Sequence, residues 1–171
     1  MITAICPGSY DPVTMGHVDV ISRAASIFDR VVVGVVGSPR HKTPLFSLDE
    51  RVDFLKEALA ELENVEVDVF SELVVEFARR WQAKAIVKGL RVISDFEWEF
   101  QMNQLNRHLA PEIETVYVMA SAQVSFVSSS GVKEIAAFGG KVDELVPDAV
   151  ARRLAEKFPN GRPGAPENPR E

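Results

Sequence analysis

The segment after the first apolar run carries residues suited to binding an anion. It reads Pro7-Gly8-Ser9-Tyr10-Asp11-Pro12-Val13-Thr14-Met15-Gly16-His17, and Gly16-His17 opens a stretch with helical periodicity. Backbone N–H groups at a helix start, together with the helix dipole, favour phosphate. His17 could donate a hydrogen bond to a phosphoryl oxygen, and Gly16 would let a nucleotide approach the backbone. The ordinary alternative for a lone histidine is a local capping or packing role. The spacing matches neither GxxxxGK[ST] nor GxGxxG.

Three later segments gather cations and hydroxyls after apolar runs. They are Ser38 to Lys42, Lys88-Gly89-Leu90-Arg91, and Ser128-Ser129-Ser130. A solvated surface lysine is the alternative for Lys42, and the serines could simply cap the following helix, with Glu134 nearby. The sequence shows no obvious Ser-His-Asp triad or carboxylate dyad.

Alternating strand and helix patterns must position these segments. Apolar runs predict strands at 2–6, 31–36, 65–69, 83–87 and 114–119, and helical periodicity predicts helices at 16–28, 47–59, 72–81, 96–109, 129–138 and 147–157. Ser47 and Glu50 have the spacing of a capping box. This alternation predicts an α/β fold of one domain, a doubly wound parallel sheet with helices on both faces. Sites in such folds lie at the carboxyl ends of strands, here after Cys6, Val36, Val87 and Met119.

Composition limits the classes of partner. The chain has 171 residues, 46% of them hydrophobic and 26% charged, which is typical of one globular domain. A net charge of −6 argues against nucleic-acid and membrane partners, because phosphate surfaces select basic proteins. It does not argue against a small anion in a local pocket.

Cysteine usage and the chain ends suggest a cytoplasmic protein. The single Cys6 can neither form an intramolecular disulfide nor hold zinc alone. The first residues lack the pattern of a signal peptide, and no run approaches the ~20 apolar residues of a membrane span. Residues 158–171 are rich in Pro and Gly, and we expect a disordered tail after a domain at 1–157.

The motifs resemble a known family. Gly8-Ser9-Tyr10-Asp11-Pro12 with Thr14-Met15-Gly16-His17 resembles the G-[ST]-F-D-P…[HT]-x-G-H signature of the nucleotidylyltransferase superfamily. Four further blocks, in order and at family spacing, resemble the bacterial phosphopantetheine adenylyltransferases: Ser38-Pro39 with Lys42-Thr43-Pro44-Leu45-Phe46, Lys88-Gly89-Leu90-Arg91 with Asp95-Phe96-Glu97-Trp98-Glu99, Asn106-Arg107-His108, and Ser125-Phe126-Val127-Ser128-Ser129-Ser130-Gly131-Val132-Lys133-Glu134. The resemblance covers residues 2–157.

The resemblance implies a Rossmann-like fold and an activity. The family transfers AMP from ATP to 4′-phosphopantetheine, giving dephospho-coenzyme A and pyrophosphate in coenzyme A biosynthesis. The attacking phosphate is already anionic, so in-line attack on the α-phosphorus needs no general base. Two alternatives are a sister transferase with another phosphorylated acceptor and a non-catalytic adenine-nucleotide sensor.

The resemblance also implies roles for individual residues. Catalysis is assigned to His17, Lys42, Arg91 and Ser129. ATP binding is assigned to Ser9, Tyr10, His17, Gly89, Leu90, Arg91, Glu99, Val124, Ser125, Phe126, Val127, Ser128, Ser129 and Ser130. Acceptor binding is assigned to Ser9, Lys42, Val74 and Lys88.

Some of these assignments have alternatives. Arg40 could replace Lys42, Glu99 could lie on a solvated face, and Val74 could be an ordinary core valine. Lys88 stands where many relatives carry arginine, so its role would be that of a point charge. Val124 and Gly131 replace residues that are bulkier in many relatives, and His108 is expected to be structural.

Two expectations concern partners beyond the substrates. No cluster of His, Cys and Asp has metal-ligand spacing, so Mg²⁺ is expected to be held mainly by ATP oxygens and water. The helix at 96–109 is apolar around most of its circumference, which predicts burial against its own sheet and against a neighbouring copy. The resemblance implies a homohexamer.

Overall fold

The computed structural model describes residues 1–37 and 43–159, and its centre is a parallel five-stranded sheet. The spatial order is β3-β2-β1-β4-β5, and every neighbouring pair is parallel. The strands are β1 (Thr3–Gly8), β2 (Arg30–Val36), β3 (Val65–Phe70), β4 (Ala85–Leu90) and β5 (Glu114–Met119). The order reverses direction at β1, and β1 and β4 lie side by side there, where such folds bind ligands.

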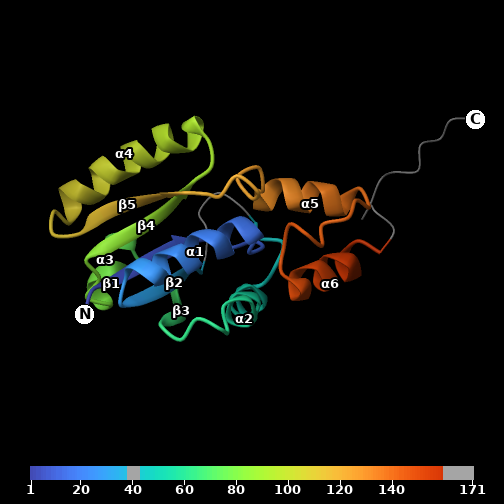
Figure 1. Ribbon diagram of the computed structural model, residues 1–171, viewed down its shortest axis with the longest axis horizontal. Coiled ribbons are helices and arrows are strands. Elements are labelled where there is room, and N and C mark those ends of the chain that lie inside the picture. The colour runs from blue at the N-terminus through green and yellow to red at the C-terminus, as the bar shows by residue number, and fades with distance from the viewer. Residues whose placement is uncertain (38–42, 160–171) are drawn as a thin grey trace, which may run out of the picture.

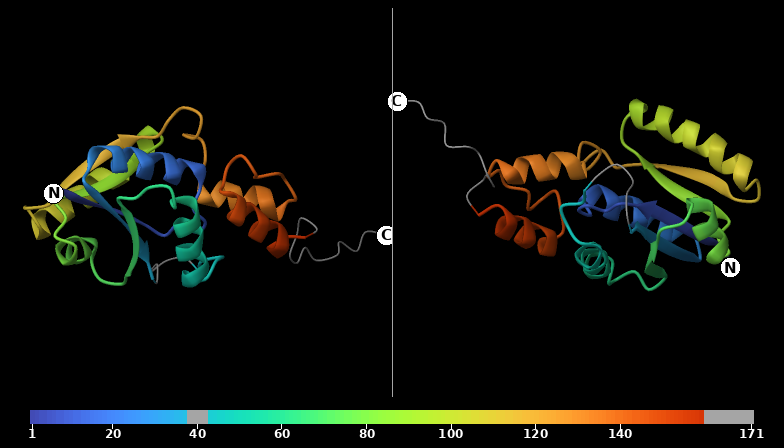
Figure 2. Two further views of the ribbon diagram at one scale, coloured as in Figure 1. Left: turned by 60° about the horizontal axis from the view of Figure 1, so that its bottom comes forward. Right: turned by 180° about the vertical axis from the view of Figure 1, so that it is seen from behind.

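Helices cover both faces of this sheet, as predicted (Figure 1). They are α1 (Met15–Ile27), α2 (Leu48–Ala58), α3 (Val74–Arg80), α4 (Ile93–Leu109), α5 (Ser129–Ala137) and α6 (Asp148–Lys157). α1, α2, α5 and α6 contribute to one core cluster and α3 to the other. The two views of Figure 2, like Figure 1, show α5 and α6 side by side at one end of the molecule.

The β-branched run of β2 explains why this strand is central. Val31, Val32, Val33 and Val35 have no exposed surface, and they alternate between the two core clusters. A strand covered on both faces reads as a continuous apolar run. β3 alternates valines with acidic residues and is less buried, because it lies at the sheet edge.

Several predicted boundaries are wrong by a few residues. α4 begins at Ile93 rather than at 96, and α3 begins at Val74 rather than at 72. β4 continues to Leu90, so Lys88 and Gly89 lie near the end of this strand and not in a loop. Boundaries depend on hydrogen bonds that periodicity does not encode. The capping box of α2 is confirmed, since Ser47 Oγ accepts from the Glu50 N–H and Glu50 accepts from the Ser47 N–H.

The predicted burial of α4 is wrong within the single chain. No side chain of its described residues is buried, and Trp98 is 64% exposed while Leu105 is 57% exposed. α4 packs along β4 and α3 through part of its surface, and Figure 1 shows it along the outside of the molecule. The large apolar side chains that it leaves exposed include Phe96, Phe100 and Leu109. An exposed apolar patch of this kind is typical of an interaction surface.

The end of the chain extends the larger core. Val150 and Leu154 of α6 are fully buried, and Phe158 packs partly buried against the same cluster. Most of the tail expected at 158–171 lies outside the described residues, which end at 159. None of the helices in the described ranges is long and apolar enough to cross a membrane.

Candidate active site

A cavity of about 500 Å³ opens at the carboxyl ends of β1 and β4. Its walls come from the β1–α1 loop, the end of β4, the first turns of α1 and α4, and the start of α5. Eleven of the residues singled out from the sequence line it: Ser9, Tyr10, His17, Lys88, Gly89, Arg91, Glu99, Val127, Ser128, Ser129 and Ser130. These residues follow the ends of three strands, β1, β4 and β5, and they meet in one place, as the rule for parallel sheets predicts.

His17 is held in one orientation by the start of its own helix. Thr14 is the N-cap of α1, and its backbone N–H donates to His17 Nδ1 over 3.0 Å. Nδ1 must therefore be unprotonated, which places the ring hydrogen of the neutral imidazole on Nε2. Burial, with a smaller contribution from the charge of Arg91, lowers the pKa of His17 to about 4. The ring that lines the cavity is a neutral hydrogen-bond donor, so the capping and the anion-binding interpretations of His17 are compatible.

Tyr10 lines the cavity, but its hydroxyl is engaged within the protein. Tyr10 is 4% exposed, and its hydroxyl donates to the Cys6 carbonyl over 2.7 Å. Its φ of 48° lies in the left-handed region, which costs a non-glycine residue energy unless its surroundings hold it. Burial raises the pKa of the Tyr10 phenol, so that group remains a neutral structural anchor.

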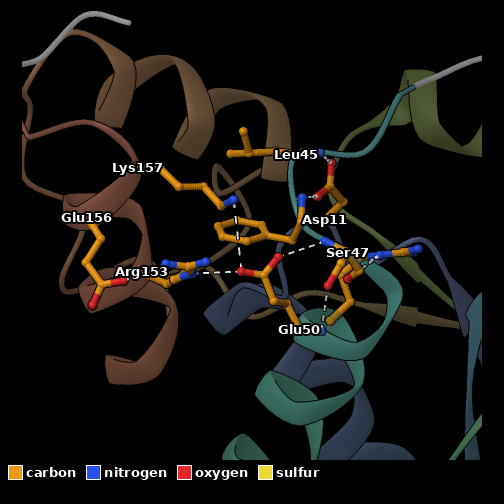
Figure 3. Close-up of polar contacts among 9 residues, drawn as sticks. Asp11, Leu45, Ser47, Glu50, Arg153, Glu156 and Lys157 are labelled. Carbon is orange, nitrogen blue, oxygen red and sulfur yellow. Dashed lines mark hydrogen bonds and ion pairs between the residues drawn. The ribbon is translucent and has the colours of Figure 1, made fainter.

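Asp11 connects the β1–α1 loop to two other segments, the residues before α2 and helix α5. Its carboxylate accepts from the Leu45 and Phe46 N–H groups, both at 2.9 Å, and pairs with Lys133 Nζ of α5 at 2.7 Å. Figure 3 shows the contact between Asp11 and Leu45. Burial acts to raise the pKa of Asp11, but the hydrogen bonds from Lys133 and the two amides outweigh it and lower the pKa. This carboxylate is committed to protein donors.

Lys88 and Glu99 face each other across one wall of the cavity. Lys88 Nζ lies 3.4 Å from Glu99 Oε1, and both side chains are largely covered. Glu99 therefore does not lie on a solvated face. Gly89 next to Lys88 has a packing reason, because a Cβ there would lie 2.8 Å from Cγ2 of Val20. α1 can approach β4 only because this residue has no side chain.

Arg91 spans the cavity mouth between α4 and the β5–α5 loop. Its guanidinium donates to both carboxylate oxygens of Asp95 at 3.1 Å and to the Val127 carbonyl at 3.3 Å. Burial acts to raise the pKa of Asp95, whereas the hydrogen bonds from Arg91 lower it by more. Asp95 orients the Arg91 fork while leaving the cation beside His17, where its charge contributes to the low pKa of that ring.

The serine run combines capping with a place at the cavity. Ser128 is the N-cap of α5, and its Oγ accepts from the Gly131 N–H. Ser129 Oγ donates to the Pro12 carbonyl over 2.7 Å, which fastens α5 to the loop after β1. The N–H groups of the first turn of a helix have no partner within the helix, so the start of α5 offers backbone donors to an anion.

Other predicted site residues do not line this cavity. Val74 packs at the start of α3 against the second core cluster, as the core-valine alternative proposes. Leu90 is buried, and Val124, Ser125 and Phe126 belong to the β5–α5 loop outside the lining, with Phe126 72% exposed. Lys42 and its alternative Arg40 lie outside the described residues.

Sequence reasoning missed several residues at the site. Thr14 could have been found, because a threonine three residues before His17 at a helix start has capping-box spacing. Trp98 lines the cavity, although its place in the motif Asp95-Phe96-Glu97-Trp98-Glu99 predicts no role for it. Asp19 accepts from both the N–H and the hydroxyl of Ser121, which anchors the β5–α5 loop to α1. No pattern in the sequence signals that contact.

No group of three His, Cys, Asp or Glu side chains within residues 1–37 and 43–159 is arranged to hold a metal ion. Cys6 lies beneath the cavity, and burial, opposed by the charge of Lys88, raises the pKa of its thiol to about 12. It is neither a thiolate nucleophile nor a soft ligand at neutral pH.

Comparisons with known proteins agree with this geometry. A family model described as cytidylyltransferase-like matches residues 5–135, which include the cavity-lining loops. Phosphopantetheine adenylyltransferase from Caldanaerobacter subterraneus subsp. tengcongensis is 54% identical over 158 residues, covering 92% of this chain and 98% of the relative. The chain belongs to the phosphopantetheine adenylyltransferase family. Enzymes of the same name from Rubrobacter xylanophilus and Heliobacterium modesticaldum are 55% and 51% identical, again over 92% of this chain, with 96% and 94% of the relatives covered. Membership in the phosphopantetheine adenylyltransferases confirms the resemblance drawn from the motifs.

Proposed function

We propose that this protein transfers AMP from ATP to 4′-phosphopantetheine, giving dephospho-coenzyme A and pyrophosphate. The observation that carries the proposal is the convergence of His17, Lys88, Arg91 and the start of α5 on one cavity. The family relationship over 92% of the chain supports the same activity. The cations lie on neighbouring elements at this end of the sheet, so a net charge of −6 does not prevent binding of two anionic substrates.

The groups around the cavity suit an in-line displacement. An oxygen of the acceptor phosphate attacks the α-phosphorus of ATP, and the bond to pyrophosphate breaks. The nucleophile is already ionised, so the protein has to align it and stabilise the charge that develops on the α-phosphoryl oxygens. His17 Nε2–H is a fixed neutral donor for one of these oxygens, and such donors act most strongly where charge develops.

The remaining residues divide between the two substrates. Lys88 would hold the acceptor phosphate as a point charge, and Glu99 keeps its ammonium in place when the cavity holds no anion. Arg91, Ser9 and the backbone N–H groups of Ser129 and Ser130 would bind the ATP phosphates. Tyr10 would contribute its backbone, since its hydroxyl is engaged. Lys42 is proposed for the attacking or the α-phosphate.

Five further residues would contact ATP or the acceptor from outside the cavity lining. Val124, Ser125 and Phe126 are proposed for the nucleotide because their loop borders the cavity through Val127. Leu90 would contribute through its place at the end of β4. Val74 is proposed to line the path of the pantetheine arm.

Magnesium is proposed as the counter-ion of the ATP phosphates. Asp11 already accepts three hydrogen bonds, two from amides and one from Lys133, so it is a poor candidate for a ligand. ATP oxygens and water would supply the octahedral oxygens that Mg²⁺ requires. The ion would neutralise charge on the leaving pyrophosphate.

The exposed apolar side of α4 supports the proposal of a homo-oligomer, a hexamer by family resemblance. Phe100, Leu105 and Leu109 are about half exposed on a helix that borders the cavity. A second copy covering them would bury this surface without blocking the cavity's other walls. We place the protein in the cytoplasm, where ATP and the acceptor are available.

An assay with different acceptors tests which acceptor the protein uses. Pyrophosphate release from ATP should be measured with 4′-phosphopantetheine, nicotinate mononucleotide and glycerol phosphate as separate acceptors. We expect release only with 4′-phosphopantetheine. Release with another acceptor alone would assign the protein to a sister transferase, and ATP binding without release would make it a nucleotide sensor.

A further inference from the structure

The interior of the protein holds an arginine that has no salt bridge among the described residues. Arg51, in the first turns of α2, is 1% exposed. Its Nη1 donates to the Ser9 carbonyl over 2.7 Å and to the Val36 carbonyl over 2.9 Å, and its Nη2 donates to the Gly37 carbonyl over 3.3 Å. Nε completes the set at 3.4 Å from the Ser47 carbonyl. One guanidinium thus joins the β1–α1 loop, the end of β2 and the N-cap of α2.

Burying a charged arginine at this position costs more folding free energy than burying an apolar side chain would. Burying a cation opposes folding unless its charge and its donors are satisfied. Burial lowers the pKa of Arg51, and the only described charge that opposes this is that of Asp11. A lysine would offer three donors on one nitrogen and could not span the three segments that the planar fork reaches. An apolar residue would leave the carbonyls of Ser9, Val36 and Gly37 without their donors.

The Ser9 carbonyl is the contact that bears on the cavity. Ser9 and Tyr10 both line the cavity, and Tyr10 has the left-handed φ of 48°. Carbonyl and N–H of one trans peptide point in opposite directions, so fixing the Ser9 carbonyl on Arg51 turns the Tyr10 N–H away from the guanidinium. Among the described residues this N–H has no acceptor. A strained backbone persists only where its surroundings over-determine it.

Three buried side chains hold this segment, and Arg51 is the one that contacts the Ser9 carbonyl. The Tyr10 ring anchors it from below through Cys6, and Asp11 anchors the next residue to Leu45 and Phe46. Arg51 directly follows Glu50, the residue that completes the capping box of α2. Figure 3 shows Glu50, its neighbour, between Ser47 and the α6 residues Arg153 and Lys157.

We propose that Arg51 is a positioning residue that holds the Ser9–Tyr10 peptide in the orientation that binds an ATP phosphate. The proposal rests on the proposed function, because it names a residue that acts on the same site without touching substrate. Arg51 acts through the Ser9 carbonyl. Its loss should loosen one peptide of the cavity wall while leaving His17, Lys88 and Arg91 in place.

The test compares Arg51→Lys with Arg153→Lys in the full-length protein. Arg153 is the matched control, because it is also an arginine near the start of α2 but is 43% exposed and reaches only carboxylates. For each variant, ATP affinity is measured by calorimetry, kcat and KM by pyrophosphate release, and amide exchange by mass spectrometry. We expect Arg51→Lys to bind ATP roughly ten- to a hundredfold more weakly, to lose kcat to a similar extent, and to exchange faster at residues 7–16. Arg153→Lys should match wild type in all three.

Two results would overturn the proposal. One is an Arg51→Lys protein that is less stable but binds ATP and turns over like wild type per folded molecule. The other is equal acceleration of exchange throughout the chain, which is the pattern of a purely structural role. If wild type binds ATP but transfers nothing, the proposed function fails, while ATP affinity and exchange still decide the role of Arg51.

A measurement on the unaltered protein covers the case in which the variant does not fold. Arginine guanidinium resonances are followed in ¹⁵N-arginine-labelled wild type during titration with ATP and Mg²⁺. We expect the Arg51 resonances to shift and those of Arg153 to stay in place. Arg51 resonances that do not move on saturation with ATP would contradict the proposal.

Discussion

The Thr14 backbone N–H donates to His17 Nδ1 over 3.0 Å, so the imidazole can present only its Nε2 hydrogen to the cavity. The same contact caps α1, since the Thr14 hydroxyl in turn accepts from the His17 N–H. The start of α1 therefore also orients the proposed catalytic donor. The geometry fixes the tautomer of His17 before substrate arrives, which is what preorganised electrostatic stabilisation requires.

Removing this donor should affect the chemical step more than binding. We expect His17→Ala to lower kcat roughly hundredfold, the loss typical of one transition-state donor, with only a modest increase in the Kd for ATP. Steady-state pyrophosphate release and calorimetry with ATP measure the two effects. An unchanged kcat would remove His17 from its proposed role.

The low pKa of His17 makes stability depend on pH in a defined window. Burial lowers this pKa from 6.5 to about 4, so between these values the unfolded chain binds a proton that the folded protein does not. Stability therefore rises with pH across this window and is lost as pH falls from about 6.5 toward 4. Urea unfolding of wild type and His17→Gln at several pH values isolates the contribution. Equal pH dependence in the two proteins would contradict it.

Lys88 should bind the acceptor phosphate as a point charge and not through a bidentate contact of the kind that arginine makes. We expect Lys88→Gln to raise the KM for 4′-phosphopantetheine by roughly tenfold or more, because a charge-assisted contact to phosphate is lost. Lys88→Arg should keep most of the affinity, since the position retains its cation beside Glu99. Acceptor titrations at saturating ATP distinguish the variants. A larger effect on the KM for ATP than on the KM for the acceptor would reassign Lys88.

Asp11 should matter for stability, because it joins three segments. Its side chain is 9% exposed, and Asp11→Asn would leave the Lys133 ammonium without its partner. We expect a loss on the order of 3 kcal/mol in the free energy of unfolding, typical of breaking a buried ion pair. Asp29→Asn, whose carboxylate is exposed, is the control and should change stability by less than about 0.5 kcal/mol. Urea unfolding at pH 7 compares them, and similar losses in both would argue against the Asp11 junction.

The exposed apolar side of α4 should determine whether the protein forms an oligomer. We expect wild type to sediment as an oligomer and Leu105→Glu to sediment as a monomer, because a charge in an apolar interface is not solvated. Ile27→Glu is the control, since Ile27 is 65% exposed at the end of α1, away from α4. Sedimentation velocity at micromolar concentration measures all three. A monomeric wild type would refute the proposed oligomer.

Local patterns in the sequence predicted most of the elements. The valine run of β2 and the Ser47–Glu50 capping box are signals carried by a few adjacent residues, and both are confirmed. The carboxyl-end rule then placed His17, Lys88, Arg91 and the serine run in one cavity, because the strands that precede them are neighbours in the sheet. Lys88 and Glu99 lie close together because α4 follows β4 directly in the chain.

Contacts between distant segments could not be predicted in this way. Asp11 bonds residues 34 and 35 positions away and Lys133 of α5, and Arg51 reaches the Ser9 carbonyl across 42 positions. The local sequence around Asp11 or Arg51 does not predict which distant residues they contact. Within one chain α4 is less buried than predicted for a related reason, since periodicity records which faces are apolar but not what covers them. Burial against a second copy stays a prediction.

The most direct test of the proposed activity is the identity of the product. Purified protein is incubated with ATP, Mg²⁺ and 4′-phosphopantetheine, and the products are quantified by mass spectrometry. We predict dephospho-coenzyme A and pyrophosphate in equal amounts, with formation of both falling together in His17→Ala. Formation of AMP or ADP without dephospho-coenzyme A would contradict the proposed adenylyl transfer.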